Sequence, residues 1–247
     1  EISGAEADGT TANSDTLVAG DKILVTVTMS EVTTVNTDAG TPTYTVNVGG
    51  VDKEATYVSG TGTNTLVFSY TVASGDLDAA EGITAGTGAL VLNDGTLQDA
   101  AGNNAALATP EVAATANSVA VDAAAPTVSS VEISGAEADG TTANSDTLVA
   151  GDKILVTVTM SEVTTVNTDA GTPTYTVNVG GVDKEATYVS GTGTNTLVFS
   201  YTVASGDLDA AEGITAGTGA LVLNDGTLQD AAGNNAALAT PEVAATA

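Results

Sequence analysis

The chain repeats itself. Residues 1–116 recur without a single change at 132–247, so the repeat period is 131 residues. Solenoid repeats are about 20 to 50 residues long and bury a core only by stacking on their neighbours. A repeat of this length can enclose a core of its own, which predicts two identical domains in series. We expect domain 1 at 1–122, a linker at 123–126 and domain 2 at 127–247.

Within each copy, apolar and polar residues alternate with the period of two that is typical of half-buried β-strands. Glycines at 49–50 and the run Asn93-Asp94-Gly95 supply tight turns, and no long amphipathic helix pattern occurs. The pattern predicts an all-β fold, with two tandem immunoglobulin-like β-sandwich domains and Greek-key connections. The predicted strands are 22–30, 44–48, 51–58, 65–72, 117–121 and 127–134, and the segment 89–98 is expected to fold about its turn.

The segment 117–134 joins the two copies. Pro126 fixes its own φ and keeps Ala125 extended, so we expect a short and fairly stiff connection after Asp122. In the frame of the repeat, domain 1 begins inside its first strand, and domain 2 has no counterpart of the strand at 117–121. The sequence leaves open whether residues 240–247 replace that strand or a neighbouring molecule supplies one.

Composition removes most of the usual active-site chemistry. The chain has no histidine, cysteine, arginine or tryptophan. Serine and cysteine nucleophiles commonly need a histidine base, and zinc, copper and haem sites depend on histidine or thiolate ligands. A carboxylate pair can hydrolyse glycosides, but sugar clefts usually carry aromatic platforms, and the chain has only six tyrosines and two phenylalanines. We therefore expect a protein that is not an enzyme.

The charge balance limits the partners. Thirty-one acidic residues face four lysines, which gives a net charge of −27. Nucleic acid and anionic membranes both attract proteins through lysine and arginine, so neither is an expected partner. No apolar run approaches the roughly 18 residues of a membrane span, and no signal peptide is visible. What this charge attracts is cations, and oxygen ligands favour calcium and magnesium.

Three carboxylates lie close together in the loop "SGDLDAAEGI" at 74–83, and the loop recurs at 205–214. Their spacing does not match an EF-hand, because no glycine stands sixth and no glutamate stands twelfth. The strand order places this loop at the end of the sandwich where the chain leaves, beside Asp122. The residues concerned are Asp76, Asp78 and Glu81, and in the second copy Asp207, Asp209 and Glu212.

The opposite end of each sandwich carries a second acidic set. It consists of Glu31, Asp99 and Asn103 in the first copy and of Glu162, Asp230 and Asn234 in the second. We expect carboxylates of both copies and of the linker to converge on the joint, where several structural calcium ions per domain pair would hold them together. The alternative is a solvated acidic surface without ions. For Lys22 and Lys53 we expect ion pairs with nearby acids rather than isopeptide bonds.

The segments "VDAAAPTVSSVEIS", "AGDKILVTVTMSE" and "LNDGTLQDAAGNNA" resemble the tandem bacterial immunoglobulin-like repeats of giant calcium-dependent surface adhesins, including the repeats-in-toxin type. The resemblance spans the whole repeat. It implies calcium ligands at Asp122, at Glu31 and Glu162, and at Asp99 and Asp230. One departure is Ala123, where the family commonly has threonine after the linker aspartate.

The resemblance also implies a role. Such repeats extend a terminal adhesive domain away from the bacterial cell, calcium at the linkers keeps the array rigid, and type I secretion exports the protein. The partners of a repeat are then its identical neighbours, and other domains bind the adhesive target. Two alternatives remain open at this stage: a module that binds a glycan or protein directly, and an acidic, salt-adapted surface domain without specific calcium sites.

Overall fold

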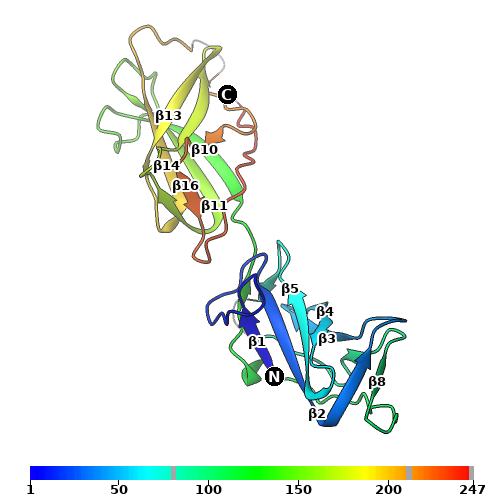
Figure 1. Ribbon diagram of the computed structural model, residues 1–247. Coiled ribbons are helices and arrows are strands. Elements are labelled where there is room, and N and C mark those ends of the chain that lie inside the picture. Colours follow the sequence, from blue (N-terminus) through cyan, green and yellow to red (C-terminus); the bar gives the residue numbers. More distant parts are fainter. Residues whose placement is uncertain (79–81, 210–212, 245–247) are drawn as a thin grey trace. The chain divides into compact units, whose positions relative to one another are not determined.

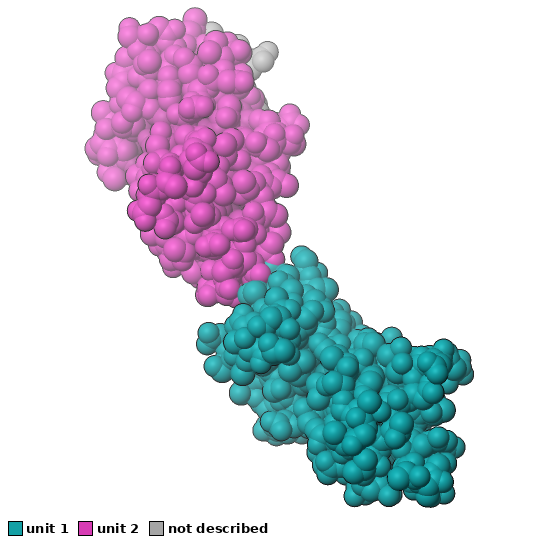
Figure 2. Space-filling model, viewed as in Figure 1, with its two compact units in different colours: residues 1–124 teal, residues 125–247 magenta. Residues whose placement is uncertain are grey.

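The structure is a computed structural model that describes residues 1–78, 82–209 and 213–244. The chain divides into two compact units, unit 1 at residues 1–124 and unit 2 at 125–247 (Figure 2). The division falls inside the predicted linker at 123–126. Among the described residues, no helix is long and apolar enough to cross a membrane.

Both units are built from antiparallel strands, and residues Ala114–Ala116 of unit 1 form a short 3₁₀ helix, η1 (Figure 1). The elements of unit 1 are β1 Ile2–Ala5, β2 Lys22–Asn36, β3 Thr43–Val48, β4 Val51–Ser59, β5 Thr63–Thr71, β6 Leu77–Asp78, β7 Leu90–Val91, β8 Thr96–Gln98, η1 Ala114–Ala116 and β9 Val121–Asp122. Those of unit 2 are β10 Val128–Ala136, β11 Lys153–Asn167, β12 Thr174–Val179, β13 Val182–Ser190, β14 Thr194–Thr202, β15 Leu221–Val222 and β16 Thr227–Gln229.

The main sheet of unit 1 has the strand order β1-β2-β5-β4-β3-β7. Strands β3, β4 and β5 follow one another as hairpins, while the earlier strand β2 lies beside β5, which is a Greek-key arrangement. The long strand β2 pairs first with β5 and then, beyond an irregularity between Thr28 and Thr33, with β8. It therefore contributes to both sheets of the sandwich. Unit 2 has the same order, with β16 on β11, and the predicted fold class is confirmed.

The core of unit 1 lies between the main sheet and the segments opposite it. Alternate residues of β2, such as Ile23 and Val25, are buried because successive side chains of a strand point to opposite faces. Phe68 on β5 packs its ring against Tyr44 and Tyr57, with ring centres 5.9 Å and 5.8 Å away. The other layer contributes the buried side chains of Leu17, Ile83, Leu97 and Val121.

The prediction of a strand at 117–121 is wrong for most of its length. Only Val121 and Asp122 pair as a strand, in β9, and η1 ends immediately before this segment. The side chain of Asn117 takes the role of a strand partner. Its Oδ1 accepts a hydrogen bond from Ile83 N, and its Nδ2 donates to Ile83 O. One amide side chain thus satisfies the backbone that a longer ladder would have paired.

The prediction that the segment 89–98 folds about Asn93-Asp94-Gly95 is confirmed, although the segment is not a hairpin. The tight turn is present, with Asn93 and Asp94 at φ 51° and 68°, but the strands on either side of it do not pair with each other. Instead β7 pairs with β3 and β8 pairs with β2. The turn therefore carries the chain from one partner strand to another rather than closing a hairpin.

The predicted position of the loop 74–83 is confirmed for its described residues. Strand β6 in this loop pairs with β9, so that Leu77 lies opposite Asp122. Two further bonds extend the contact, because Gly75 N donates to Ala123 O and Ala123 N donates to Asp76 O. The acidic loop and the end of the last segment of unit 1 thus form one edge.

Candidate metal-binding site

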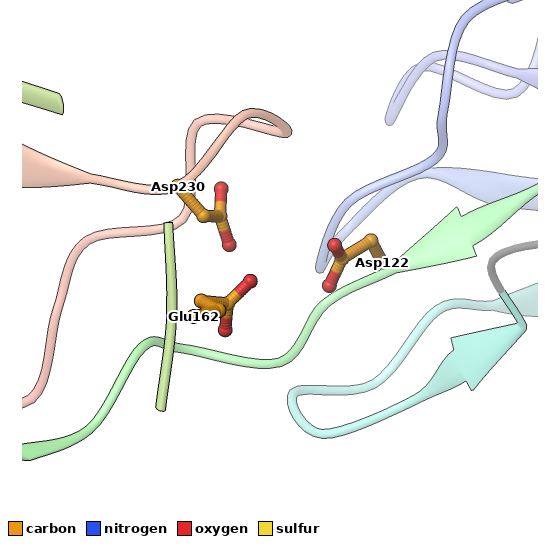
Figure 3. Close-up of side chains that lie close together, drawn as sticks. All are labelled: Asp122, Glu162 and Asp230. Atoms are coloured by element: carbon orange, nitrogen blue, oxygen red, sulfur yellow. The ribbon is translucent and has the colours of Figure 1, made fainter. Parts of the chain in front are cut away.

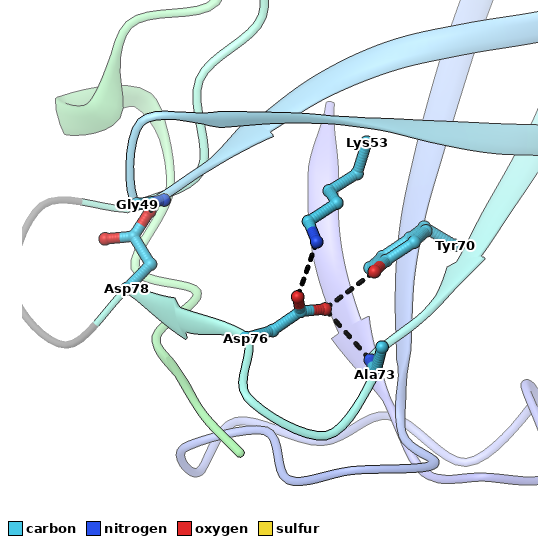
Figure 4. A network of polar contacts seen from close by, with 6 residues as sticks. All are labelled: Gly49, Lys53, Tyr70, Ala73, Asp76 and Asp78. Atoms are coloured by element: carbon cyan, nitrogen blue, oxygen red, sulfur yellow. Dashed lines mark hydrogen bonds and ion pairs between the residues drawn. The ribbon is translucent and has the colours of Figure 1, made fainter. Parts of the chain in front are cut away.

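Asp76, the first carboxylate of the loop, binds three other residues of unit 1. Its Oδ1 lies 2.6 Å from Lys53 Nζ, and its Oδ2 accepts hydrogen bonds from Tyr70 Oη at 2.6 Å and Ala73 N at 2.9 Å (Figure 4). Burial alone would raise the pKa of Asp76, but the bonds from Lys53, Tyr70 and Ala73 outweigh it and lower the pKa. A metal ion at Asp76 would have to compete with this lysine.

The same network recurs in unit 2. Asp207 pairs with Lys184 at 2.7 Å and accepts hydrogen bonds from Tyr201 Oη at 2.7 Å and Ala204 N at 2.8 Å. These contacts, with the one from Lys184 largest, lower the pKa of Asp207 from 3.8 to about 2. The expectation that Lys53 pairs with an acid is confirmed, whereas Lys22 donates to Thr71 Oγ1 at 2.6 Å.

Asp78, the second carboxylate of the loop, binds the hairpin between β3 and β4. Its Oδ2 accepts a hydrogen bond from Gly49 N at 3.0 Å (Figure 4). The hairpin approaches so closely that a Cβ on Gly49 would lie 2.0 Å from Leu77 O. Glu81 and Glu212 lie outside the described residues. Metal binding at Asp76, Asp78, Asp207 and Asp209 remains a prediction, and the structure gives Asp76, Asp78 and Asp207 a role within the fold.

Asp99 organises the turn that follows β8 in unit 1. Its Oδ1 accepts hydrogen bonds from Ala101 N and Asn103 N, and its Oδ2 accepts one from Asn103 Nδ2 at 2.7 Å. The side-chain bond from Asn103 is the largest of several contacts that lower the pKa of Asp99. Asp99, Asn103 and Glu31 all line one open pocket of about 420 Å³.

In unit 2 the equivalent residues lie in a more enclosed setting. Asp230 is 6% exposed, and Asn234 donates to both of its carboxylate oxygens at 2.8 Å, from N and from Nδ2. One carboxylate oxygen of Glu162 lies within 4.8 Å of one of Asp230 (Figure 3). Figure 3 draws this pair with Asp122, the last residue of β9, whose Oδ1 accepts a hydrogen bond from Ala124 N.

Each of the four lysines contacts a residue of its own unit. Lys53 and Lys184 bind Asp76 and Asp207, and the other two lysines donate to threonine hydroxyls. The sequence holds no arginine or histidine. Two carboxylates this close repel each other unless a cation or a proton lies between them. Glu162 and Asp230 therefore offer the kind of oxygen ligands that a divalent cation prefers.

Comparison of the chain with protein-family models, with curated proteins and with solved structures finds no match.

The sequence did not indicate the part that Tyr70 takes in the Asp76 network. Predicting this contact would have required knowledge of how β4 aligns laterally with β5. That alignment contains a register shift between Tyr57 and Ser59, and an irregularity of this kind leaves no mark in the alternation of apolar residues.

Proposed function

We propose that this chain is a non-enzymatic spacer: two identical modules of a bacterial cell-surface adhesin, joined by a linker that calcium stiffens. The observation that carries the proposal is the unchanged repetition of a self-contained β-sandwich across a linker of a few residues. Two identical surfaces add no second specificity, but they do add length. A spacer is the role in which such repetition has a use.

The hydrogen bonds at the start of unit 2 support the proposal of calcium at the linker. Pro126 O accepts a hydrogen bond from Ala237 N, and Thr127 exchanges backbone and side-chain hydrogen bonds with Ser161. Ser161 is the neighbour of Glu162. Asp122 lies four positions before Pro126, a span of at most about 14 Å, so the covalent chain limits how far Asp122 can lie from the start of unit 2.

We propose that Asp122 completes a ligand set with Glu162 and Asp230. Calcium takes six to eight oxygen ligands, which backbone carbonyls and water can supply beside these carboxylates. The bonds from Asn234 do not exclude an ion at Asp230, because each carboxylate oxygen has two lone pairs. Calcium bound in this way would tie the linker to unit 2 and limit the freedom of Ala124 and Ala125.

The energy of such a site is large enough to matter. Extracellular calcium modules bind at about 10⁻⁴ M, so that roughly 10 mM calcium adds about 2.7 kcal/mol to stability. In a domain of this size that corresponds to a shift of about 10 °C in the melting temperature.

The proposed setting is extracellular, after type I secretion. The proposed partners are neighbouring repeats, with neither nucleic acid nor membrane among them.

The experiment is thermal unfolding combined with small-angle scattering of the whole chain in calcium, in magnesium, in sodium chloride of matched ionic strength, and in chelator. We expect calcium alone to raise the melting temperature of unit 2 and to sharpen the distribution of interatomic distances. An equal response to sodium would instead indicate general charge screening. No response to chelation would overturn the calcium-stiffened spacer.

The repeat supplies a matched control. The double variant Glu162→Gln with Asp230→Asn removes the proposed ligands, while Glu31→Gln with Asp99→Asn makes the same changes at the same positions of unit 1. We expect the first variant, and Asp122→Asn, to abolish the calcium response. The second variant keeps the response. Equal loss in both double variants would contradict the assignment of the site to the linker.

A further inference from the structure

The last segment of unit 1 is held on both sides by backbone hydrogen bonds. On one side Asp122 N donates to Leu17 O at 2.9 Å. On the other side Gly75 N donates to Ala123 O and Ala123 N donates to Asp76 O, both at 2.8 Å. Both backbone groups of Ala123, the first residue of the predicted linker, are therefore bound to unit 1.

The turn at 73–76 presents the two groups that bind Ala123. Asp76 N donates to Ala73 O at 3.0 Å, and Asp76 Oδ2 accepts a hydrogen bond from Ala73 N at 2.9 Å. Gly75 has φ 89°, a left-handed conformation that glycine adopts without steric cost. The side chain of Asp76 thus bonds across the turn, and the N–H of Gly75 and the C=O of Asp76 are left to bind Ala123.

Two side chains of the main sheet fix the Asp76 carboxylate. Lys53 Nζ on β4 lies 2.6 Å from Asp76 Oδ1, and Tyr70 Oη on β5 donates to Oδ2 at 2.6 Å (Figure 4). The side chain of Asp76 is only 5% exposed. Hydrogen bonds to a charged group are about twice as strong as bonds between neutral groups. One buried carboxylate therefore connects the middle strands of the main sheet to the turn that binds the start of the linker.

Lys53 brings to this loop a positive charge of the chain itself. Oδ2 of Asp76 accepts two hydrogen bonds, which use both of its lone pairs, and Oδ1 contacts the ammonium group. A divalent cation at Asp76 would have one lone pair left to use and would be repelled by Lys53. The charge that holds the turn at 73–76 therefore does not vary with the calcium concentration.

Binding of Ala123 shortens the part of the linker that can move. In unit 2, Ala237 N donates to Pro126 O at 2.8 Å, so the residue three positions after Ala123 is bound as well. Only Ala124 and Ala125 lie between these two bound residues. If Ala123 came loose, the mobile segment would lengthen, because each released residue regains its backbone freedom.

We propose that Lys53 and Tyr70 position the start of the interdomain linker: through Asp76 they hold the turn at 73–76 against Ala123, without a metal ion. The network then does more than stabilise unit 1 as a whole, because it acts on the linker residue that the turn binds. This role lies within unit 1 and needs no calcium. An experiment in chelator therefore tests it separately from the proposed calcium site.

The test measures amide hydrogen exchange of the whole chain by NMR in chelator. Ala123 lies in the segment 117–131, which the repeat does not duplicate, so its amide signal has no counterpart from unit 2. We expect Lys53→Met and Tyr70→Phe each to raise the exchange rate of the Ala123 amide about tenfold, because each removes a hydrogen bond to a charged group. The amide of Asp122, whose partner lies on the other side of the segment, should change less.

Unit 2 provides the matched controls. Lys184→Met and Tyr201→Phe make the same changes in the equivalent network around Asp207. They should lower the stability of unit 2 and leave the exchange rate of the Ala123 amide unchanged, because the turn that binds Ala123 belongs to unit 1.

Three results would each overturn the proposal. The first is unchanged exchange at Ala123 in the folded variants of unit 1. The second is an equal rise at Ala123 and Asp122, which would indicate that the whole segment opens together with unit 1. The third is the same rise in Lys184→Met. Tyr70→Phe keeps the ion pair of the network, so it gives the result if Lys53→Met does not fold, and circular dichroism verifies the folding of each variant.

Discussion

At the scale of single residues, the carboxylate of Asp76 depends on its cation. Lys53→Met removes the ammonium that lies 2.6 Å from a carboxylate whose side chain is 5% exposed. Tyr70 and Ala73 still donate to Asp76. Because a buried charged group then lacks one partner, we expect unit 1 to lose about 2 kcal/mol of unfolding free energy. Chemical denaturation measures the loss.

Lys22→Met is the control for this substitution. Lys22 donates to the exposed Thr71 hydroxyl, and we expect a change within about 0.5 kcal/mol. Equal losses in the two variants would show that the network at Asp76 contributes nothing beyond general charge.

The equivalent pair of unit 2, Lys184 and Asp207, predicts a dependence on pH. The pKa of Asp207 is lowered from 3.8 to about 2, by Lys184 above all. A lowered folded pKa contributes stability that is complete above the unfolded value and is lost as the pH falls toward the folded value. We therefore expect the stability difference between the wild type and Lys184→Met to be constant at neutral pH and to shrink between pH 3.8 and about 2.

Taking the difference between two chains cancels the general relief of acidic repulsion, which affects both alike. Urea unfolding at a series of pH values provides the data. A difference that stays constant down to pH 2 would contradict the role given to Lys184.

For the acidic loop 74–83, the sequence predicted where the carboxylates lie but not what they contact. The position of the loop 74–83 beside Asp122 followed from strand order, because alternate connections of an antiparallel sandwich lie at opposite ends. The engagement of Asp76 by Tyr70 did not follow, since it depends on the register shift between β4 and β5. Sequence order predicts which end of a sandwich a carboxylate occupies, and packing determines what it contacts.

At the scale of elements, the turn between β4 and β5 requires a glycine. Gly60 has φ 111°, and a Cβ there would lie 2.0 Å from Thr65 O. Gly60→Ala therefore combines backbone strain with a backbone clash, and we expect it to cost unit 1 more than about 2 kcal/mol. Gly20→Ala has a similar φ of 103° with no atom near its Cβ, so it measures the strain alone.

Thermal unfolding of the Gly60 and Gly20 variants separates the two effects. Gly20→Ala should cost only about 1 kcal/mol, and equal costs for the two variants would exclude the clash with Thr65. The twin substitution Gly191→Ala should affect unit 2 by the amount that Gly60→Ala affects unit 1.

Strand β10 shows how the length of one strand changes the burial of a side chain on its neighbour. In unit 2, β10 begins early enough for Val128 to pair with Met160, which is 1% exposed. In unit 1, β1 begins at Ile2, and the equivalent Met29 is only partly buried and lines the pocket that also contains Glu31. The same residues are thus more or less buried according to the segment beside them, which no pattern within one repeat predicts.

At the scale of the whole molecule, the two units of residues 1–247 should differ in stability although their repeated sequences are identical. The segment 117–123 packs on Leu17 and Ile83 of unit 1, whereas the equivalent Leu148 and Ile214 of unit 2 are only partly buried. Burying Val121 and covering Leu17 and Ile83 contributes about 3 kcal/mol at the usual value for apolar side chains. We therefore expect two calorimetric transitions in chelator, with unit 2 melting about 10 °C below unit 1.

Core substitutions assign the two transitions. Phe68 and Phe199 are fully buried at equivalent positions, and replacing either with alanine should cost about 3 to 5 kcal/mol. Because each substitution acts on its own core, Phe199→Ala should lower the first transition and Phe68→Ala the second. A single transition that both phenylalanine variants lower equally would mean that the units unfold as one, and the segment 117–123 would then give unit 1 no separate advantage.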